Sequence, residues 1–485
     1  MTTCYNTCIV CVWTPKEASA NMPISKSNQQ LGSHLSPRVE GHNFEQYRAH
    51  FHDLKARYDR LLEAHDMDVL AVHAGQPKRH FMDDSEYDFR VNPHFKAICP
   101  LVDAPHSWVI MRQGAKPTLI LFAPEDFWHE VVNIDDADWL PLFHVELITT
   151  PSDIERFIPY NKDRVAYLGE HIEVAQALGI MQVNPESLLH SLHYHRVFKS
   201  DYELQCIATA NRIAAAGHEA VEAAFYAGRS EFECWLAYMQ ATQQGPTQAP
   251  YQSIVAQNQH AAILHYRGKS TQPLHGRLKS LMIDAGASYR GYASDISRSY
   301  SFSEQQGEHA VFAELVKRVD ALTLELVDWV RPHRYFGSIQ EQAHYGVAQI
   351  LLDFGWVKGL SLDQMIDERV TYAFMPHSFG HMLGLQVHDV GGNLEDASGK
   401  ASQAPERFPN LRTNRKIEPR QVVTIEPGVY FIDALLQPFG HGPLARHFDW
   451  QALDAMRDFG GVRIEDNIVV TEHGASNLTR AQGLR

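Results

Sequence analysis

The chain has 485 residues, which is too long for a single hydrophobic core and indicates two or three domains. Its 43 Lys and Arg residues against 58 Asp and Glu residues give a net charge of −15, which disfavours nucleic acid and anionic membranes as main partners. No apolar run approaches the length of a membrane span. The six cysteines are few for this length, and Cys99, Cys206 and Cys234 each stand alone in apolar or helical stretches. We therefore expect reduced core cysteines and a cytoplasmic protein.

The amino-terminal part begins with residues 1–42, which lack periodicity and are expected to be a disordered extension. The cysteines within it, at positions 4, 8 and 11, lack the paired spacing of a zinc site. A helix is expected from the N-cap Asn43, because apolar residues recur at three- and four-residue steps between Phe44 and Leu61. Strands are expected over residues 69–72, 108–111, 119–122 and 165–168. Residues 43–197 should therefore form a small α/β domain, and they contain no glycine-rich nucleotide motif.

Residues 198–485 are expected to form a second, catalytic domain. Capping boxes, in which a serine and a glutamate satisfy free N–H groups at a helix start, are predicted at 200–203, 230–233 and 338–341. Apolar strands are predicted over 281–287, 292–300, 422–431 and 462–470. The expected architecture is an antiparallel sheet covered by helices on one side.

Two aspartates flank a turn that is expected around Tyr289-Arg290. If the hairpin is centred there, Asp284 and Asp295 are direct cross-strand partners with Cβ atoms roughly 5 Å apart. Opposed carboxylates in an apolar strand pair repel one another and would need a cation between them. In the alternative, the register differs by one residue and each side chain points to solvent.

Further strands deliver Glu426 just before a Pro-Gly turn, and Arg463 and Glu465 on one strand face. A buried glutamate is costly unless it is paired or coordinated. Near them in the sequence lies a histidine cluster at 375–392 in a glycine-rich stretch. Four carboxylates with one imidazole are an oxygen-rich set that suits two divalent ions, manganese rather than a thiolate-loving metal.

Four motifs occur in order, namely D-A-G-A-(seven residues)-D, P-H-x-x-G-H-x-L-G-L-Q-V-H-D-V-G-G, T-I-E-P-G and G-G-V-R-I-E-D-N. With them, the chain from about residue 43 to its end resembles the methionine aminopeptidase and prolidase superfamily, and within it the bacterial Xaa-Pro dipeptidases, which are similar to organophosphorus acid anhydrolases. The resemblance implies an α/β amino-terminal domain followed by a pita-bread catalytic domain. It also implies a homodimer.

The resemblance further implies a ligand set for two divalent ions, in which Asp295 and Glu465 bridge both. The five implied ligands are Asp284, Asp295, His381, Glu426 and Glu465. It places Arg412 on the free carboxylate of the dipeptide, and Tyr251 and His265 in the substrate pocket. Asp84 would reach the neighbouring subunit's site.

The implied reaction is hydrolysis of Xaa-Pro dipeptides, in which a metal-bridging hydroxide attacks the scissile amide. Glu426 would be the general base, and His377 or His388 would stabilise the tetrahedral intermediate. Arg463 is expected to contact the metal carboxylates rather than the ions. Each of these residues also has a purely structural alternative. His377 could pack beneath Pro376, and His388 could form a structural hydrogen bond to Asp389. Tyr251 and His265 could belong to the pocket wall or the core, and Asp84 could lie in a solvated loop.

Three other functions are consistent with the same fold: an aminopeptidase P that acts on longer Xaa-Pro peptides, a metal-free binding module, and incidental phosphotriester hydrolysis. The sequence departs from the family pattern at Tyr335-Phe336 and at Ser378-Phe379. We expect these departures to affect substrate preference rather than metal chemistry.

Overall fold

The computed structural model describes residues 42–128, 134 and 137–484. The predicted extension of residues 1–42, with its three cysteines, lies outside them apart from His42, which begins the first helix. That helix, α1, spans His42–Ala64, so Asn43 lies within it and is not the residue that precedes it. Among the described residues, no helix is long and apolar enough to cross a membrane.

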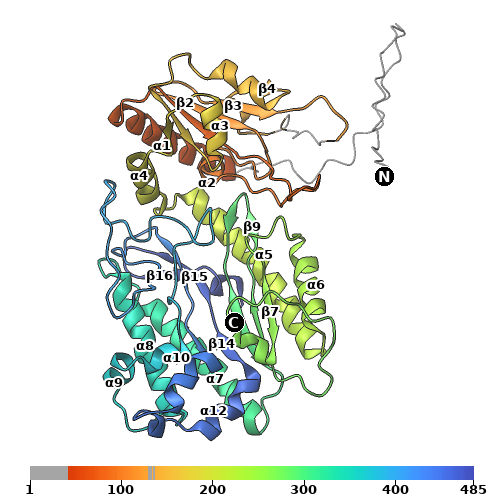
Figure 1. Cartoon of the computed structure of the whole chain (residues 1–485), viewed down its shortest axis with the longest axis vertical. Coiled ribbons are helices and arrows are strands. Elements are labelled where there is room, and N and C mark those ends of the chain that lie inside the picture. Colours follow the sequence, from red (N-terminus) through yellow and green to blue (C-terminus); the bar gives the residue numbers. More distant parts are fainter. Residues whose placement is uncertain (1–41, 129–133, 135–136, 485) are drawn as a thin grey trace, which may run out of the picture. The chain divides into compact units, whose positions relative to one another are not determined.

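The amino-terminal half is built on a six-stranded sheet with strand order β4-β3-β2-β1-β5-β6 (Figure 1). All four predicted strands are confirmed, and the middle two pair antiparallel as a hairpin. The strands are β1 Val69–His73, β2 Trp108–Arg112, β3 Thr118–Phe122, β4 His144–Ile148, β5 Val165–Leu168 and β6 Gln182–Val183. Helix α1 buries the predicted apolar face, from Tyr47 to Leu61, and the shorter helices are α2 Pro93–Ile98, α3 Ile172–Ala177 and α4 Glu186–Arg196.

The carboxyl-terminal half has short antiparallel strands covered by long helices. One sheet has the order β11-β8-β7 and a second has the order β12-β15-β16. The first packs on α5 Asp201–Tyr226 and α6 Glu231–Thr242, whose side chains share its apolar core. Helices α7 Gly307–Trp329 and α8 Phe336–Asp353 share the largest core with β12 and β15. The strands of the two sheets are β7 Ile254–Gln257, β8 Ser280–Asp284, β11 Ser297–Ser301, β12 Val422–Ile425, β15 Asp466–Val470 and β16 Ala475–Asn477.

Two of the three predicted capping boxes are present. Ser200 and Ser230 each accept a hydrogen bond from the backbone N–H three residues on, and the glutamate there returns the contact. The third is wrong, because α8 begins at Phe336 and Ser338 already lies inside the helix. The hydroxyl of Ser338 donates instead to the Tyr335 carbonyl at 2.7 Å.

Three of the predicted strands are interrupted, each at a carboxylate. The break between β10 (Tyr292–Ala293) and β11 holds Asp295, and the break between β12 and β13 (Gly428–Tyr430) holds Glu426. Glu465 lies between β14 (Gly461–Arg463) and β15. Interruptions of this kind redirect a side chain out of the regular alternation, which is why they occur beside active sites.

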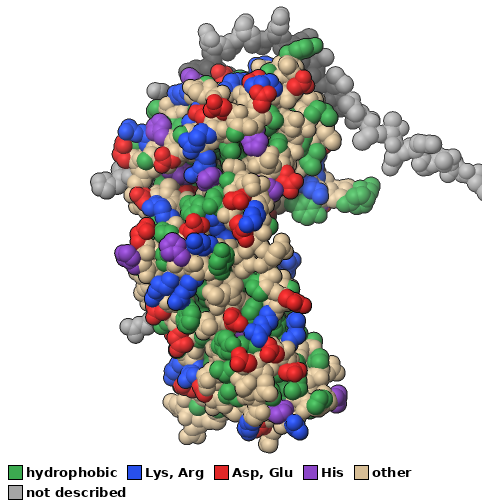
Figure 2. Space-filling model, turned by 90° about the vertical axis from the view of Figure 1, so that its left-hand side faces the viewer, with side chains coloured by type: hydrophobic (Ala, Val, Ile, Leu, Met, Phe, Trp, Pro, Cys, Tyr) green, Lys and Arg blue, Asp and Glu red, His purple; other side chains and the backbone are tan. Residues whose placement is uncertain are grey.

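The surface charges are mixed. Figure 2 shows acidic and basic side chains interspersed over the visible face, and the free cysteines Cys99, Cys206 and Cys234 are buried. The net charge of −15 is therefore not concentrated on that face.

Candidate metal centre

The aspartates Asp284 and Asp295 face the same side of the hairpin, but they are not direct partners. Asp284 ends β8 and pairs with Ser297 of β11, two residues beyond Asp295. The predicted register is wrong because the turn lies one residue later, at Arg290-Gly291. Their φ angles of 52° and 83° are typical of a type I′ hairpin turn. The partner shifts by two residues, and an even step keeps both side chains on one face.

The Tyr251 hydroxyl joins these two carboxylates. It lies 2.8 Å from Oδ1 of Asp284 and 2.5 Å from Oδ1 of Asp295. Burial, with the charges of both aspartates, raises the pKa of Tyr251 well above its ordinary value. The phenol therefore stays protonated and acts as a hydrogen-bond donor at the centre.

His381 is oriented with one ring nitrogen toward the carboxylates. Its Nδ1 lies 3.0 Å from the Met382 carbonyl oxygen, which can only accept, so Nδ1 carries the proton. Nε2 is then the free basic atom, 3.4 Å from Oδ2 of Asp295 and 3.6 Å from Oε1 of Glu426. A backbone partner on one nitrogen that frees the other is the usual arrangement of a metal-binding imidazole.

The glutamates Glu426 and Glu465 complete the cluster. Burial, more than any charge, raises the pKa of Glu426 to about 7. Burial and the neighbouring Asp295 and Glu426 raise the pKa of Glu465 well above its ordinary value. Ser297 donates from Oγ to Oε2 of Glu465 at 2.8 Å. Buried carboxylates with raised pKa values form a group that a bound cation would stabilise.

The donor set fits a divalent metal. Asp295, His381 and Glu465 offer ligand atoms that all lie within 4.8 Å of one another, the group of this kind found among the described residues. Asp284 and Glu426 contact the same group through Tyr251 and His381. Oxygen donors with one imidazole suit a hard or borderline cation such as Mn²⁺.

Arg463 is ion-paired with one of the carboxylates, Asp284. Its Nη2 donates to Oδ2 of Asp284 at 2.7 Å, and its Nε donates to Oγ of Ser297 at 3.0 Å. The guanidinium is buried, and burial would lower its pKa, but Tyr430 and the carboxylates raise it. It therefore stays charged and orients the cluster from behind.

His377 and His388, the other two histidines of residues 375–392, differ in whether a ring nitrogen is left without a partner among the described residues. Nδ1 of His377 contacts the Ser378 carbonyl at 2.8 Å, and Nε2 lies 2.9 Å from the Tyr430 hydroxyl, so both nitrogens are engaged. Nδ1 of His388 lies 3.2 Å from Nη1 of Arg412. Because a guanidinium only donates, Nδ1 accepts and Nε2 carries the proton. Burial, above all, lowers the pKa of each histidine to about 4, so both are neutral at pH 7.

A cavity of about 910 Å³ opens beside the cluster. Its walls include Tyr251, His265, Asp284, Asp295, Leu385 and His388. His265 is thus in the pocket but does not contact the carboxylates through any hydrogen bond of the described chain. Phe336 is buried against Phe379, with ring centroids 6.2 Å apart, and Tyr335 is exposed, so neither lines this cavity.

Asp84 lies away from the candidate metal centre of its own chain. It lies in an exposed loop, and it is not among the residues that line the cavity. The neighbouring Phe81 and Met82 are each 91% exposed, which is unusual for large apolar side chains.

Sequence reasoning missed two contacts of the centre. Tyr430 receives a hydrogen bond from Nη1 of Arg463 at 3.0 Å and holds His377. Ser297 holds Glu465 and Arg463 together. Of these two residues, only Ser297 could have been predicted from the sequence, because it lies two residues after Asp295, on the same face of the expected strand.

Models of two known protein families match the chain. Residues 205–472 match the model of metallopeptidase family M24, and residues 45–194 match that of the Xaa-Pro dipeptidase N-terminal domain. The chain belongs to metallopeptidase family M24. Family membership implies use of a divalent metal ion, and the carboxylate cluster is a possible site for it.

Curated relatives cover nearly the whole chain. Xaa-Pro dipeptidase 1 of Idiomarina loihiensis is 46% identical over 435 residues, 90% of this chain and 95% of the relative. Xaa-Pro dipeptidase of Aeromonas hydrophila subsp. hydrophila is 44% identical over 439 residues, 90% of this chain and 98% of the relative.

Solved structures with the same fold are more distant in sequence. Aminopeptidase P from Escherichia coli with the inhibitor Pro-Leu has a TM-score of 0.67 at 21% identity, over 90% of this chain and 95% of that one. Proline aminopeptidase P II from Yersinia pestis has a TM-score of 0.65 at 22% identity, over 90% of this chain and 96% of that one. The predicted fold, an amino-terminal domain followed by a pita-bread domain, is thus confirmed.

Proposed function

We propose that the chain is an Xaa-Pro dipeptidase that works with two divalent ions, manganese by preference. The observation that carries the proposal is the convergence of four carboxylates and one oriented imidazole, delivered by separate strands and a loop, beside a substrate-sized cavity. The curated relatives named Xaa-Pro dipeptidase support the substrate class.

The proposed ligands are Asp284, Asp295, His381, Glu426 and Glu465. Of these, Asp295 and Glu465 would contribute to holding both ions, and together with His381 they offer ligand atoms within 4.8 Å of one another. When bound, two ions would lower the pKa of a water molecule and polarise the scissile carbonyl. Glu426 takes the proton of the attacking water and delivers it to the proline nitrogen.

His388, rather than His377, is the proposed donor to the developing oxyanion. Its Nε2 proton is free because Nδ1 accepts from Arg412, whereas both nitrogens of His377 have partners. Such a donor is worth about 3 kcal/mol in other hydrolases. Arg412 is the proposed contact for the free carboxylate of a dipeptide, a role that suits the guanidinium group. Tyr251 and His265 are the proposed pocket residues.

A homodimer and a cytoplasmic location belong to the same proposal. The exposed apolar side chains beside Asp84 support a contact with a second subunit, in which Asp84 would enter the partner's cavity. The buried free cysteines support a reducing compartment. We place the domain boundary between 43–197 and 198–485, and the matches that end at 194 and begin at 205 support it.

An aminopeptidase P shares the fold, but the relatives above 40% identity carry the dipeptidase name. A metal-free binding module would have no need of five retained donor side chains. Phosphotriester hydrolysis is open to the same metal pair and is proposed only as incidental.

The experiment is a manganese-supplemented assay over a panel of Xaa-Pro dipeptides, repeated on His381→Ala and on His52→Ala, a matched exposed histidine. Manganese-dependent turnover that is lost in His381→Ala and kept in His52→Ala supports the proposal. No turnover in the wild type with manganese would refute it and favour the binding module.

A further inference from the structure

Helix α6 begins with a buried glutamate that is not one of the proposed metal ligands. Glu231 is its first residue, and only 1% of it is exposed. The helix lies beside β7, the edge strand of the sheet in which β8 ends at Asp284 (Figure 1). A buried carboxylate is costly unless hydrogen bonds satisfy it, so the partners of Glu231 indicate its role.

Glu231 uses both of its oxygens to hold one segment, residues 257–270. Oε1 accepts from the Gln257 N–H at 2.8 Å and lies 2.7 Å from Nδ1 of His260. Oε2 accepts from the Tyr266 hydroxyl and from the Ser270 N–H, each at 2.8 Å. The rings of His260 and Tyr266 stack with their centroids 4.5 Å apart. One side chain therefore holds the segment at four points.

The same segment forms part of the wall of the cavity beside the metal centre. His265 and Arg267 line that cavity, and neither side chain forms a hydrogen bond or ion pair within the part of the chain that the structure describes. Tyr266 lies between them in the sequence, does not line the cavity, and packs against the core that includes Tyr430. Because one backbone joins the three residues, the contact of Tyr266 with Glu231 fixes where His265 and Arg267 lie.

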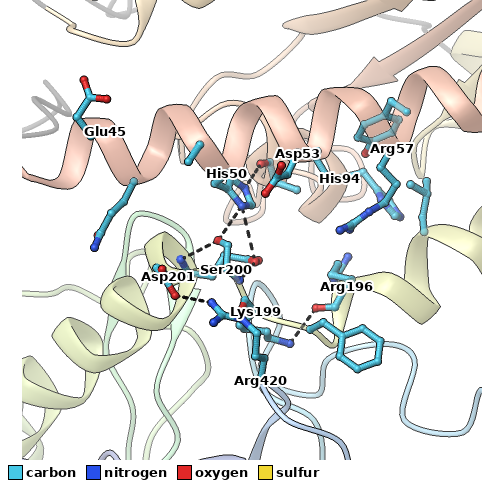
Figure 3. Close-up of a pocket in the computed structure, with 18 residues that line it drawn as sticks. Glu45, His50, Asp53, Arg57, His94, Arg196, Lys199, Ser200, Asp201 and Arg420 are labelled. Carbon is cyan, nitrogen blue, oxygen red and sulfur yellow. Dashed lines mark hydrogen bonds and ion pairs between the residues drawn. The ribbon is translucent and has the colours of Figure 1, made fainter. Parts of the chain in front are cut away.

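The polar groups of a second cavity, of about 540 Å³ beside α1, hold one another instead. Figure 3 shows His50 against Ser200 and Asp201 against Arg420, at 2.9 Å and 2.6 Å. The two side chains at the cavity beside the metal centre have no such side-chain partner among the described residues. Their position depends on the backbone that Glu231 holds.

We propose that Glu231 is a positioning residue that fixes residues 257–270, so that His265 and Arg267 face the substrate. Glu231 does not line the cavity and acts through Tyr266. The proposal rests on the proposed dipeptidase function, because the substrate in question is the dipeptide. All five proposed metal ligands lie outside residues 257–270, so substrate affinity should depend on Glu231 more than the chemical step does.

The test compares the manganese-loaded wild type with three variants. In Glu231→Gln, the amide NH2 group faces two donors whichever way it is turned, so two of the four contacts are lost. Tyr266→Phe removes only the hydroxyl contact and keeps the ring. Glu219→Gln, an exposed glutamate on α5, is the matched control.

The first measurement is amide hydrogen exchange, which does not depend on activity. Exchange within residues 257–270 should be about tenfold faster or more in Glu231→Gln, with the rest of the chain protected as in the wild type. Tyr266→Phe should show a smaller change in the same residues, and Glu219→Gln should show none. Unchanged exchange in residues 257–270, or equal acceleration over the whole chain, would overturn the proposal.

The second measurement is steady-state kinetics on Ala-Pro. KM should rise about tenfold or more in Glu231→Gln and about threefold in Tyr266→Phe, whereas kcat should change less than about threefold. Faster local exchange with an unchanged KM would overturn the role in substrate affinity. An inactive wild type would refute the proposed dipeptidase function instead, and the exchange measurement would still decide whether Glu231 holds the segment.

Discussion

Nη2 of Arg463 donates a hydrogen bond to Oδ2 of Asp284 at 2.7 Å, so a permanent cation holds the carboxylate that ends β8. The same guanidinium reaches Ser297, which in turn holds Glu465. Two of the proposed ligands are thus oriented by one side chain before any metal binds. The arrangement explains how strands from distant parts of the chain converge without direct pairing of Asp284 and Asp295.

Arg463→Lys tests this orientation. Lysine keeps the charge but cannot reach Asp284, Ser297 and Tyr430 together, so the concentration of manganese needed for half-maximal activity should rise about 10- to 100-fold. A manganese activation curve measures it, with Arg79→Lys as an exposed control. An activation curve identical to that of the wild type would contradict the role of Arg463.

Metal removal should lower the melting temperature. Burial raises the pKa values of Asp295, Glu426 and Glu465, so the metal-free cluster is destabilised by carboxylates that lack a counter-charge. Ions that bind only the folded state should restore about 5 °C or more, as measured by scanning calorimetry in EDTA and after addition of manganese. Glu465→Gln should show little response to manganese, and an equal response in both proteins would count against the site.

Asp389→Asn should destabilise the protein in a pH-dependent way. Burial alone would raise the pKa of Asp389, but Arg196 and Lys199 outweigh it and hold the pKa below its ordinary value. A carboxyl group with a lowered folded pKa contributes stability that is present above the unfolded pKa and is lost as the pH falls through the folded pKa.

Urea unfolding should therefore show a loss of about 3–5 kcal/mol for Asp389→Asn at pH 7, because two buried cations lose their partner. The gap to the wild type should stay constant down to about pH 4 and narrow below it. Asp353→Asn, in a half-exposed pair with Arg318, should lose less than about 1 kcal/mol. A gap for Asp389→Asn that widens at low pH would contradict the assignment.

Arg412→Gln tests recognition of the dipeptide carboxylate. The variant should lose about 10- to 100-fold in kcat/KM on Ala-Pro, the cost of one charged hydrogen-bonding group. Ala-Pro amide, which lacks the carboxylate, should be hydrolysed by wild type and variant at similar rates. Equal losses on both substrates would show that Arg412 acts through His388 instead.

Much of the fold could be predicted from the sequence because its signals are local. The apolar period of α1 and the capping boxes at Ser200 and Ser230 depend on neighbouring residues, and the structure contains them. The hairpin register could not be predicted, since it depends on whether Arg290 adopts a positive φ angle, which a non-glycine residue rarely does.

The strand breaks and the supporting contacts were beyond local reasoning. The break before β15 is tied to a bridge between Ser297 of β11 and Glu465, which are 168 residues apart in the sequence. Tyr430 was missed for the same reason, because its contacts with His377 and Arg463 span long sequence separations. Motif order identified which residues carry the chemistry, but only the tertiary structure shows which atoms are free to act.

The most direct measurement of the central claim is the ratio of kcat/KM for Ala-Pro to that for Ala-Pro-Ala with manganese-loaded enzyme. A dipeptidase in which Arg412 holds the carboxylate next to the scissile bond should prefer Ala-Pro by about tenfold or more. A preference for Ala-Pro-Ala would contradict the account and indicate an aminopeptidase P.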